Sequence, residues 1–249
     1  MVCRTIILPL ELCQFVLQNK LVTTFKMYLM LKYRCSGILK LSKAESEQLC
    51  TDMGFLSNKS FKKHLKLLIK LNWIGYNEQT EYYFIRSLEY LRKQNSFYRR
   101  KGVEFSFDWI ETLKEFLFSS VAKSLIEEQK RKLIHRSKIL AIRRGVLQKG
   151  CTLQPLPIAF PIALSVFGKV LKMSRENASI IKSSAVEIGF IKVKSNIVQT
   201  SFNEFQLNAF KKAYSELNNG SILVINSKIC IRKPDLISSD LYLRKRKKI

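Results

Sequence analysis

The sequence predicts a mainly α-helical protein with small β-hairpins, an α+β fold in which two similar units are joined by a long basic helix. Three observations lead to this prediction. Apolar residues recur at helical spacing behind good capping residues, short strands follow two of the helices, and the same order of elements occurs twice. With 249 residues, 47% of them hydrophobic, the chain has enough apolar material to build packed cores.

The first unit is expected to span residues 1–100 and to contain three helices. Apolar residues at helical spacing place the first helix at Thr23–Arg34, and Gly37 is suited to end it. Ser42 and Glu45 form a capping-box pattern that predicts the start of the second helix. Ser57 is a plausible N-cap for the third helix.

The third helix of this unit has two unlike faces, followed by a hairpin. Its buried stripe is expected to consist of Phe61, Leu65, Leu68 and Ile69, and its opposite side carries Lys59, Lys62, Lys63, Lys66 and Lys70. Two strands, Trp73–Tyr76 and Tyr82–Ile85, are predicted around a polar turn at Asn77–Thr80. His64 and Trp73 are expected in the core or at its boundary.

A short apolar stretch, Ile38–Leu41, lies between the first two helices. This order of helix, short strand, helix, helix and hairpin resembles the winged helix-turn-helix domains of DNA-binding regulators and replication initiators. The resemblance implies that the third helix enters the major groove and that the hairpin tip approaches the backbone or the minor groove. Glu78 and Glu81 at that tip would repel phosphate. The DNA-contacting candidates are Ser57, Asn58, Lys59, Lys62, Lys63, Lys66 and Lys70. The alternatives are a lysine face that is only solvated and a protein-binding module.

The second unit, residues 151–235, repeats the first in pattern when the sequence is shifted without gaps so that Ser57 falls on Ser174. The helix Arg175–Ile188 is predicted to bury Ile181, Ala185, Val186 and Ile188. Its outward candidates for DNA contact are Ser174, Arg175, Asn177, Ser179 and Lys182, because Arg and Asn are suited to bidentate contacts with guanine and adenine. The alternative is that Arg175 and Asn177 only cap and solvate the helix start. A hairpin that turns at Lys194–Asn196 is expected to add Lys192 and Lys194.

Residues 101–150 are expected to form a connecting amphipathic and basic helix, with a helical pattern from Phe107 to Ile142. Its apolar stripe, which includes Phe116 and Leu125, is expected to pack on either unit, on a second copy or on a partner. Arg143 and Arg144 belong to a basic stretch that is expected to cross the DNA backbone or to remain a solvated linker.

After the second hairpin, a helix at Phe205–Tyr214 and a strand at Ile222–Ile225 are predicted. Residues 236–249 are expected to form a basic tail, either a DNA-binding arm or a disordered segment, with the candidates Arg244, Lys245 and Arg246.

The composition favours nucleic acid as partner. The formal net charge is +25, from 44 Lys and Arg against 19 Asp and Glu, far more than solubility requires. No uncharged apolar run reaches the roughly 18 to 20 residues of a membrane span. The six cysteines contain no CxxC pair and only two histidines accompany them, so we expect reduced thiols, no metal and no cofactor.

No motif for catalysis occurs. The sequence contains no Gly-rich phosphate loop, no paired-carboxylate motif and no nucleophile signature, so we predict no catalytic residue and no enzyme. We expect a sequence-selective double-stranded DNA-binding protein, a replication initiator or transcription regulator of a mobile element, phage or bacterium. The alternatives are a nonspecific packaging protein and a protein-binding scaffold. The expected partners are replication or transcription machinery and further copies of the chain. The expected location is the cytoplasm, at the bacterial nucleoid or in the host of a phage, with no membrane contact.

Overall fold

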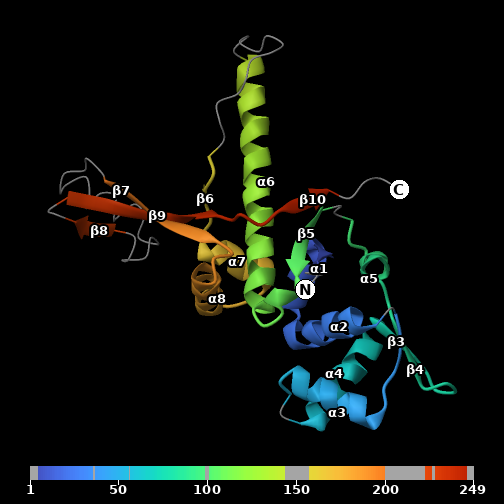
Figure 1. Cartoon of the computed structure of the whole chain (residues 1–249). Coiled ribbons are helices and arrows are strands. Elements are labelled where there is room, and N and C mark those ends of the chain that lie inside the picture. The colour runs from blue at the N-terminus through green and yellow to red at the C-terminus, as the bar shows by residue number, and fades with distance from the viewer. Residues whose placement is uncertain are drawn as a thin grey trace. The chain divides into compact units, whose positions relative to one another are not determined.

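The computed structural model describes residues 5–35, 37–55, 57–98, 101–143, 157–199, 222–225 and 228–245 (Figure 1). The fold is mixed α+β with several small sheets, as expected. Contacts divide the chain into two compact units, Met1–Val121 with Leu241–Ile249, and Ala122–Asp240. Residues 101–121 and the segment after Asp240 therefore group with the first unit, and the boundaries differ from the four expected segments 1–100, 101–150, 151–235 and 236–249.

An antiparallel sheet joins the early and late parts of the first unit. It consists of β1 (Thr5–Pro9), β5 (Lys101–Ser106) and β10 (Leu243–Lys245), in the order β1-β5-β10, and α1 (Leu10–Gln18) packs beside it. Gly102 is required here because a Cβ at this position would lie 2.4 Å from Cγ2 of Ile7. Residues 243–245 of the expected tail thus form a strand.

The rest of the first unit contains the three helices and the hairpin that the sequence predicts, together with a helix after the hairpin that it does not predict. In chain order these elements are α2 (Val22–Arg34), β2 (Ile38–Lys40), α3 (Lys43–Asp52), α4 (Asn58–Lys70), β3 (Ile74–Asn77), β4 (Tyr82–Ile85) and α5 (Leu88–Gln94). The three strands pair antiparallel in the order β2-β4-β3, so the strand between α2 and α3 joins the outer side of the hairpin. The helices α2, α3 and α4 lie together in Figure 1.

Trp73 is the centre of the core that supports α4. Its ring meets those of Phe25 and Tyr28 edge-on, with centroid distances of 5.7 Å in both cases. The apolar side of α4 adds Phe61, Leu65 and Leu68, which are all buried. The predicted stripe is confirmed for these three residues, and the placement of Trp73 in the core is confirmed as well.

The start of α3 is held by the predicted capping box. The hydroxyl of Ser42 accepts a hydrogen bond from the Glu45 amide at 3.2 Å, and the Glu45 carboxylate accepts one from the Ser42 amide at 2.8 Å. These bonds hold the pKa of Glu45 below its usual value. Both orphan amides are thereby satisfied.

Replacement of Ser42 by Ala is expected to lower the free energy of unfolding of the first unit by about 1 kcal/mol, since an N-cap hydroxyl is lost. Urea unfolding followed by tryptophan fluorescence measures this, because Trp73 and Trp109 both lie in that unit. Ser42→Thr keeps a capping hydroxyl and is the matched control. Equal stability of the Ala and Thr variants would contradict the capping role.

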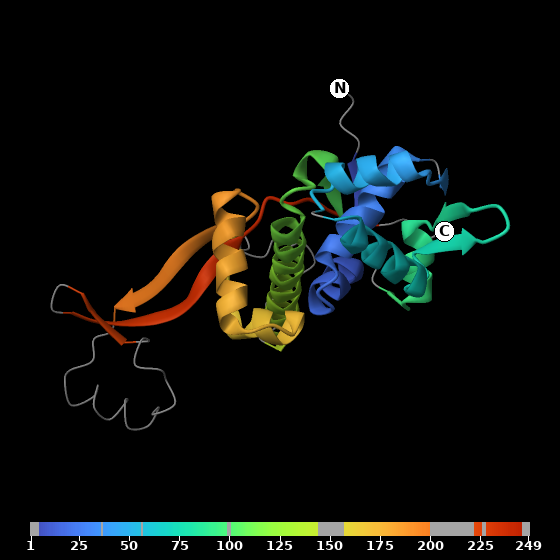
Figure 2. The same cartoon turned by 90° about the horizontal axis from the view of Figure 1, so that it is seen from below.

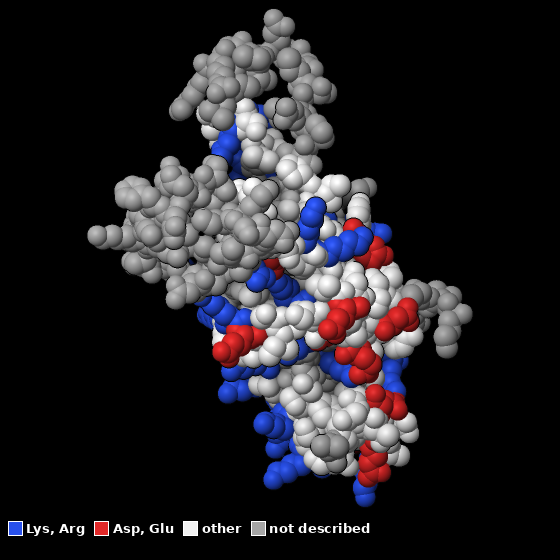
Figure 3. All heavy atoms as spheres, turned by 90° about the vertical axis from the view of Figure 1, so that its left-hand side faces the viewer, with Lys and Arg blue, Asp and Glu red and all other residues white. Residues whose placement is uncertain are grey.

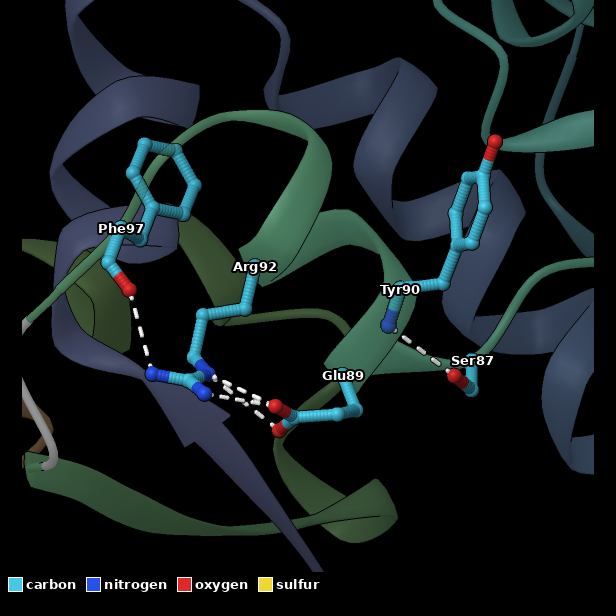
Figure 4. A network of polar contacts seen from close by, with 5 residues as sticks. All are labelled: Ser87, Glu89, Tyr90, Arg92 and Phe97. Carbon is cyan, nitrogen blue, oxygen red and sulfur yellow. Dashed lines mark hydrogen bonds and ion pairs between the residues drawn. The ribbon is translucent and has the colours of Figure 1, made fainter.

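A polar network fixes α5 after the hairpin (Figure 4). Arg92 donates to both carboxylate oxygens of Glu89 and, through Nη1, to the carbonyl of Phe97 at 3.2 Å. The hydroxyl of Ser87 accepts from the Tyr90 amide at 3.0 Å and caps the helix. This network orders the turn from which the chain continues toward β5.

The long helix is present, but it starts later than expected. A short 3-10 helix (Phe107–Trp109) precedes α6 (Leu113–Arg143). Phe116 is buried, with ring centroids 4.9 Å from Phe105 and 5.5 Å from Trp109. The idea that this apolar stripe offers a partner-docking surface is therefore wrong for the part of α6 before Ala122, because its own unit covers it.

The second unit contains the remainder of α6 and a second set of helices and strands. In chain order these are β6 (Phe160–Pro161), α7 (Leu164–Leu171), α8 (Arg175–Glu187), β7 (Lys192–Gln199), β8 (Ile222–Ile225) and β9 (Lys228–Ser238). The sheet order is β6-β9-β7, and β8 also pairs with β9. The strand Ile222–Ile225 is confirmed, whereas the predicted helix Phe205–Tyr214 lies outside the described residues.

The predicted turn at Lys194–Asn196 is wrong, because β7 runs straight through it. Its partner is β9, which the sequence reading missed, and the register shifts between Lys194 and Asn196 opposite Pro234. Proline has no amide hydrogen for the ladder, so an irregularity at this point is expected. Figures 1 and 2 show β7 and β9 as a long ribbon that extends away from α7 and α8.

The two units share an arrangement as well as a sequence pattern. Under the ungapped shift that places Ser57 on Ser174, α4 falls on α8, and both helices have 13 residues. Asn72 falls on Gly189, and both have positive φ, 54° and 89°. In each sheet the strand that comes last in the sequence lies between two earlier strands, in the orders β2-β4-β3 and β6-β9-β7.

Candidate nucleic-acid interface

The outward side of α4 is a dense and uncompensated positive surface, which we call the lysine face. It consists of the exposed side chains of Lys59, Lys62, Lys63, Lys66 and Lys70. Among the described residues, no carboxylate lies within 4.0 Å of any of these five amino groups. At the lower end of Figure 3, where Figure 1 places α3 and α4, Lys and Arg project on the left with no Asp or Glu beside them, whereas the right side carries both signs of charge.

An open hollow lies over the first turns of α4. It is lined by Ser57, Asn58, Lys59, Ser60, Lys62, Lys63 and Lys66, so it joins the N-terminal polar residues to four of the lysines. The hydroxyl of Ser57 caps the helix by accepting from the Ser60 amide at 3.3 Å. All the candidates that the sequence proposed on this helix therefore lie on one exposed surface.

His64 lies at the boundary between the lysine face and the core, as expected. Its Nδ1 is 2.8 Å from Oγ1 of Thr24, and its ring packs 5.3 Å from that of Phe55. Burial and the charge of Lys63 lower the pKa of His64, which disfavours the charged imidazole near neutral pH. The positive charge of the surface thus comes from the lysines.

The tip of the first hairpin is less repulsive to phosphate than its sequence indicates. Asn77 Oδ1 accepts hydrogen bonds from the amides of Gln79 and Thr80, which shapes the turn. The carboxylate of Glu81 is 3.2 Å from the amino group of Lys40 on β2. Lys40 offsets this acid, a contact that the sequence reading missed because β2 pairs with β4 across the sheet.

In α8 the first-turn candidates are exposed, but Lys182 is not. Ser174, which caps the helix, Arg175 and Asn177 are exposed, and Ser179 is half-buried. Lys182 is only 13% exposed, and its Nζ is 2.8 Å from Oδ2 of Asp235 on β9. Its predicted outward position is therefore wrong. The alignment of the two units indicates the inward position, because it places Lys182 on the core residue Leu65.

The predicted core residues of α8 are also only partly correct. Ala178, Ile181 and Ala185 are buried. Val186 and Ile188 are 37% and 41% exposed, so their predicted burial is wrong. The buried side of α8 therefore consists of two alanines and one isoleucine.

The ribbon of the second unit carries one paired and one open lysine. Lys192 is 2.6 Å from Asp240, and this hydrogen bond lowers the pKa of Asp240. A carboxylate therefore accompanies the amino group of Lys192. Lys194 is exposed with no carboxylate near it in the part of the chain that the structure describes. Arg232 and Lys233 on β9, which the sequence reading missed, are exposed as well.

The remaining candidates lie on α6, on β10 or outside the described residues. Arg143 ends α6, and Arg144 and Arg246 lie outside the described residues. Arg244 on β10 is half-exposed and lies 3.3 Å from Glu104 on β5, so a carboxylate already accompanies it. Lys245 ends the same strand.

The described residues show few features of other site types. Cys13, Cys35, Cys50 and Cys230 are free thiols, and burial raises the pKa of Cys13 to about 12. Within the described ranges, no three His, Cys, Asp or Glu side chains gather as a metal site requires. None of the helices in those ranges has the length and apolar character needed to cross a membrane.

Comparison with protein-family models, with curated proteins and with solved structures finds no match to this chain. What the protein binds is therefore inferred from its own charge, fold and surface chemistry. The lysine face, with its five exposed amino groups free of nearby carboxylates in the described structure, is the feature with the clearest chemistry. A polyanion with regularly spaced charges is the ligand that such a surface suits.

Proposed function

We propose that this protein binds double-stranded DNA through two winged-helix units, as a sequence-selective replication initiator or transcription regulator. The observation that carries the proposal is the lysine face of α4. Five lysines on one side of a 13-residue helix, with no acid among the helix residues, provide phosphate contacts along the whole length of that helix.

The order of elements supports the winged-helix assignment. In the first unit, α2, β2, α3, α4 and the β3–β4 hairpin follow in the sequence expected of such a domain. α4 is then the helix that enters the major groove. The second unit repeats this order with α6, β6, α7, α8 and the strands β7 and β9, and with the same position of the last strand in the sheet.

Sequence selectivity is favoured by the difference between the two helices. Lysine contacts to phosphate position a protein on DNA without specifying a sequence. α8 offers Arg175 and Asn177 on its exposed first turn, the side-chain types that form bidentate contacts with guanine and adenine. We assign contacts with the phosphate backbone to α4 and contacts with base edges to α8.

The proposal is tested by selection of bound duplexes from a random library at about physiological salt, with source-genome fragments in competition. A defined motif is expected, and repeats of it beside an origin would favour an initiator over a regulator. Tight, salt-sensitive binding without an enriched motif would instead indicate a nonspecific packaging protein. No binding to any duplex would reject DNA as the partner and leave a protein-binding scaffold.

Replacement of Arg175 and Asn177 by Ala is expected to cost about 1 to 3 kcal/mol for each lost base contact on the preferred duplex and little on other duplexes. Titrations of the full chain with both duplexes measure the difference. Lys172→Ala, a charge removed from an exposed residue just before the cap of α8, is the control for charge alone. Equal losses on both duplexes would make Arg175 and Asn177 backbone contacts.

A further inference from the structure

The outward line of α8 has a chemistry opposite to that of the lysine face. Glu176, Ile180, Ser183 and Glu187 follow one another at helical spacing, and all four are exposed. Under the shift that places Ser57 on Ser174, they occupy the positions of Lys59, Lys63, Lys66 and Lys70. Two helices in equivalent positions therefore present lysines in one unit and acidic, aliphatic and hydroxyl groups in the other.

This line is unsuited to phosphate. The carboxylates of Glu176 and Glu187 repel phosphate, and the amino group of Lys182 is already held by Asp235. Glu, Ser and an aliphatic side chain do have partners on base edges in the major groove. A carboxylate accepts from cytosine N4, and an apolar side chain contacts the C5-methyl group of thymine.

Ile180 is the residue that this chemistry singles out. Ile180 is 63% exposed, more than any other aliphatic residue on α8. It lies one turn after Glu176 and Asn177, at the centre of the outward line, where the equivalent position of α4 carries Lys63. A branched aliphatic group has no hydrogen bond to offer, so methyl groups are the part of a base edge that it can contact.

We propose that Ile180 is a specificity-determining residue that recognises thymine methyl groups in the major groove. The proposal rests on the proposed function, since it requires α8 to lie against base edges. It adds to that function the expectation that the preferred duplex contains thymine at the position facing the middle of α8, next to the bases read by Arg175 and Asn177. Contact with a methyl group buries about one methylene equivalent of apolar surface, which corresponds to about a fourfold change in affinity.

The test uses the full chain and the duplex obtained by selection, resynthesised with deoxyuridine in place of one thymidine at a time. Uracil lacks only the C5-methyl group and keeps the pairing edge. The wild-type chain is expected to lose about fourfold in affinity at one or two of these positions. Ile180→Ala should bind the unmodified duplex about as weakly and should be indifferent to the same uracil substitutions.

Ile188→Ala is the matched control, because Ile188 is an exposed isoleucine that follows the last residue of the same helix and lies off the outward line. It should keep the uracil sensitivity of the wild type. If uracil lowers affinity equally in the wild type and in Ile180→Ala, another residue reads the methyl group and the proposal fails. Indifference of the wild type to every uracil would also overturn it while leaving sequence-selective binding intact. If selection yields no preferred duplex, the proposed function and this proposal fall together.

Discussion

Replacement of Lys62, Lys63 and Lys66 by Ala is expected to weaken binding to every duplex by roughly a hundredfold at about 0.15 M salt. Each lost phosphate contact should reduce the slope of log K against log salt by about 0.9, or by about 2.7 for three contacts. The three side chains are exposed, so their removal takes charge from the surface and leaves the buried residues Phe61, Leu65 and Leu68 in place. Affinities measured over a range of salt concentrations give both quantities.

A matched control removes the same charge from elsewhere in the first unit. Lys43, Lys93 and Lys114 are exposed residues of α3, α5 and α6, and their replacement by Ala changes the net charge equally. This control should reduce affinity only slightly and keep the salt slope. A slope that stays unchanged in the α4 variant would remove the lysine face from the interface.

Replacement of Asp235 by Ala is expected to destabilise the second unit by about 3 kcal/mol. The carboxylate of Asp235 is 16% exposed and its partner Lys182 is 13% exposed, so the variant leaves an unpaired, largely buried ammonium group. Arg232, 3.9 Å from the same carboxylate, also loses its partner. Both tryptophans belong to the first unit, so amide hydrogen exchange of α8 is the suitable measurement.

A double variant separates the ion pair from a general effect of the substitution. Lys182 falls on Leu65 under the alignment of the two units, so Lys182→Leu combined with Asp235→Leu replaces the pair by an apolar contact that the first unit already uses. Such replacements are often neutral or stabilising. Recovery of most of the lost stability is expected. A double variant as unstable as Asp235→Ala would show that Asp235 acts through contacts other than Lys182.

Local signals in the sequence were sufficient for a large part of the fold. The capping box of Ser42 and Glu45, the amphipathic pattern of α4 and the polar turn at Asn77–Thr80 each involve residues close in the chain, and all three are confirmed. The bounds of α8 differ from the prediction by one residue at the C-terminal end. Capping and periodicity act over a few residues, which is why they can be read without knowledge of the rest of the fold.

The errors in strand pairing arise where the partner strand lies far along the chain. β7 pairs with β9, whose Pro234 and charged residues concealed it, so a hairpin was predicted at Lys194–Asn196 instead. Likewise, β10 pairs with β5. Strand pairing of this kind depends on tertiary contacts that no local pattern encodes.

In the candidate site, too, features set by local patterns were predicted and features set by distant contacts were not. The five lysines of α4 were predicted because helical periodicity alone puts them opposite the buried stripe. The ion pairs Lys182–Asp235 and Lys192–Asp240 were not predicted, since their carboxylates follow β7 by many residues. The burial of Lys182 could nevertheless have been predicted, because its position in the repeat is that of the core residue Leu65.

The pairing of β10 with β5 makes the second unit an insertion within the first. The chain leaves the first unit after Val121, forms the second as Ala122–Asp240, and then returns to add β10 beside β5. During synthesis at the ribosome, the first unit can build its β1–β5 pair early, but it waits for the third strand until the whole second unit has been translated. The three-stranded sheet can therefore be completed only after both candidate DNA-contacting helices, α4 and α8, have been synthesised.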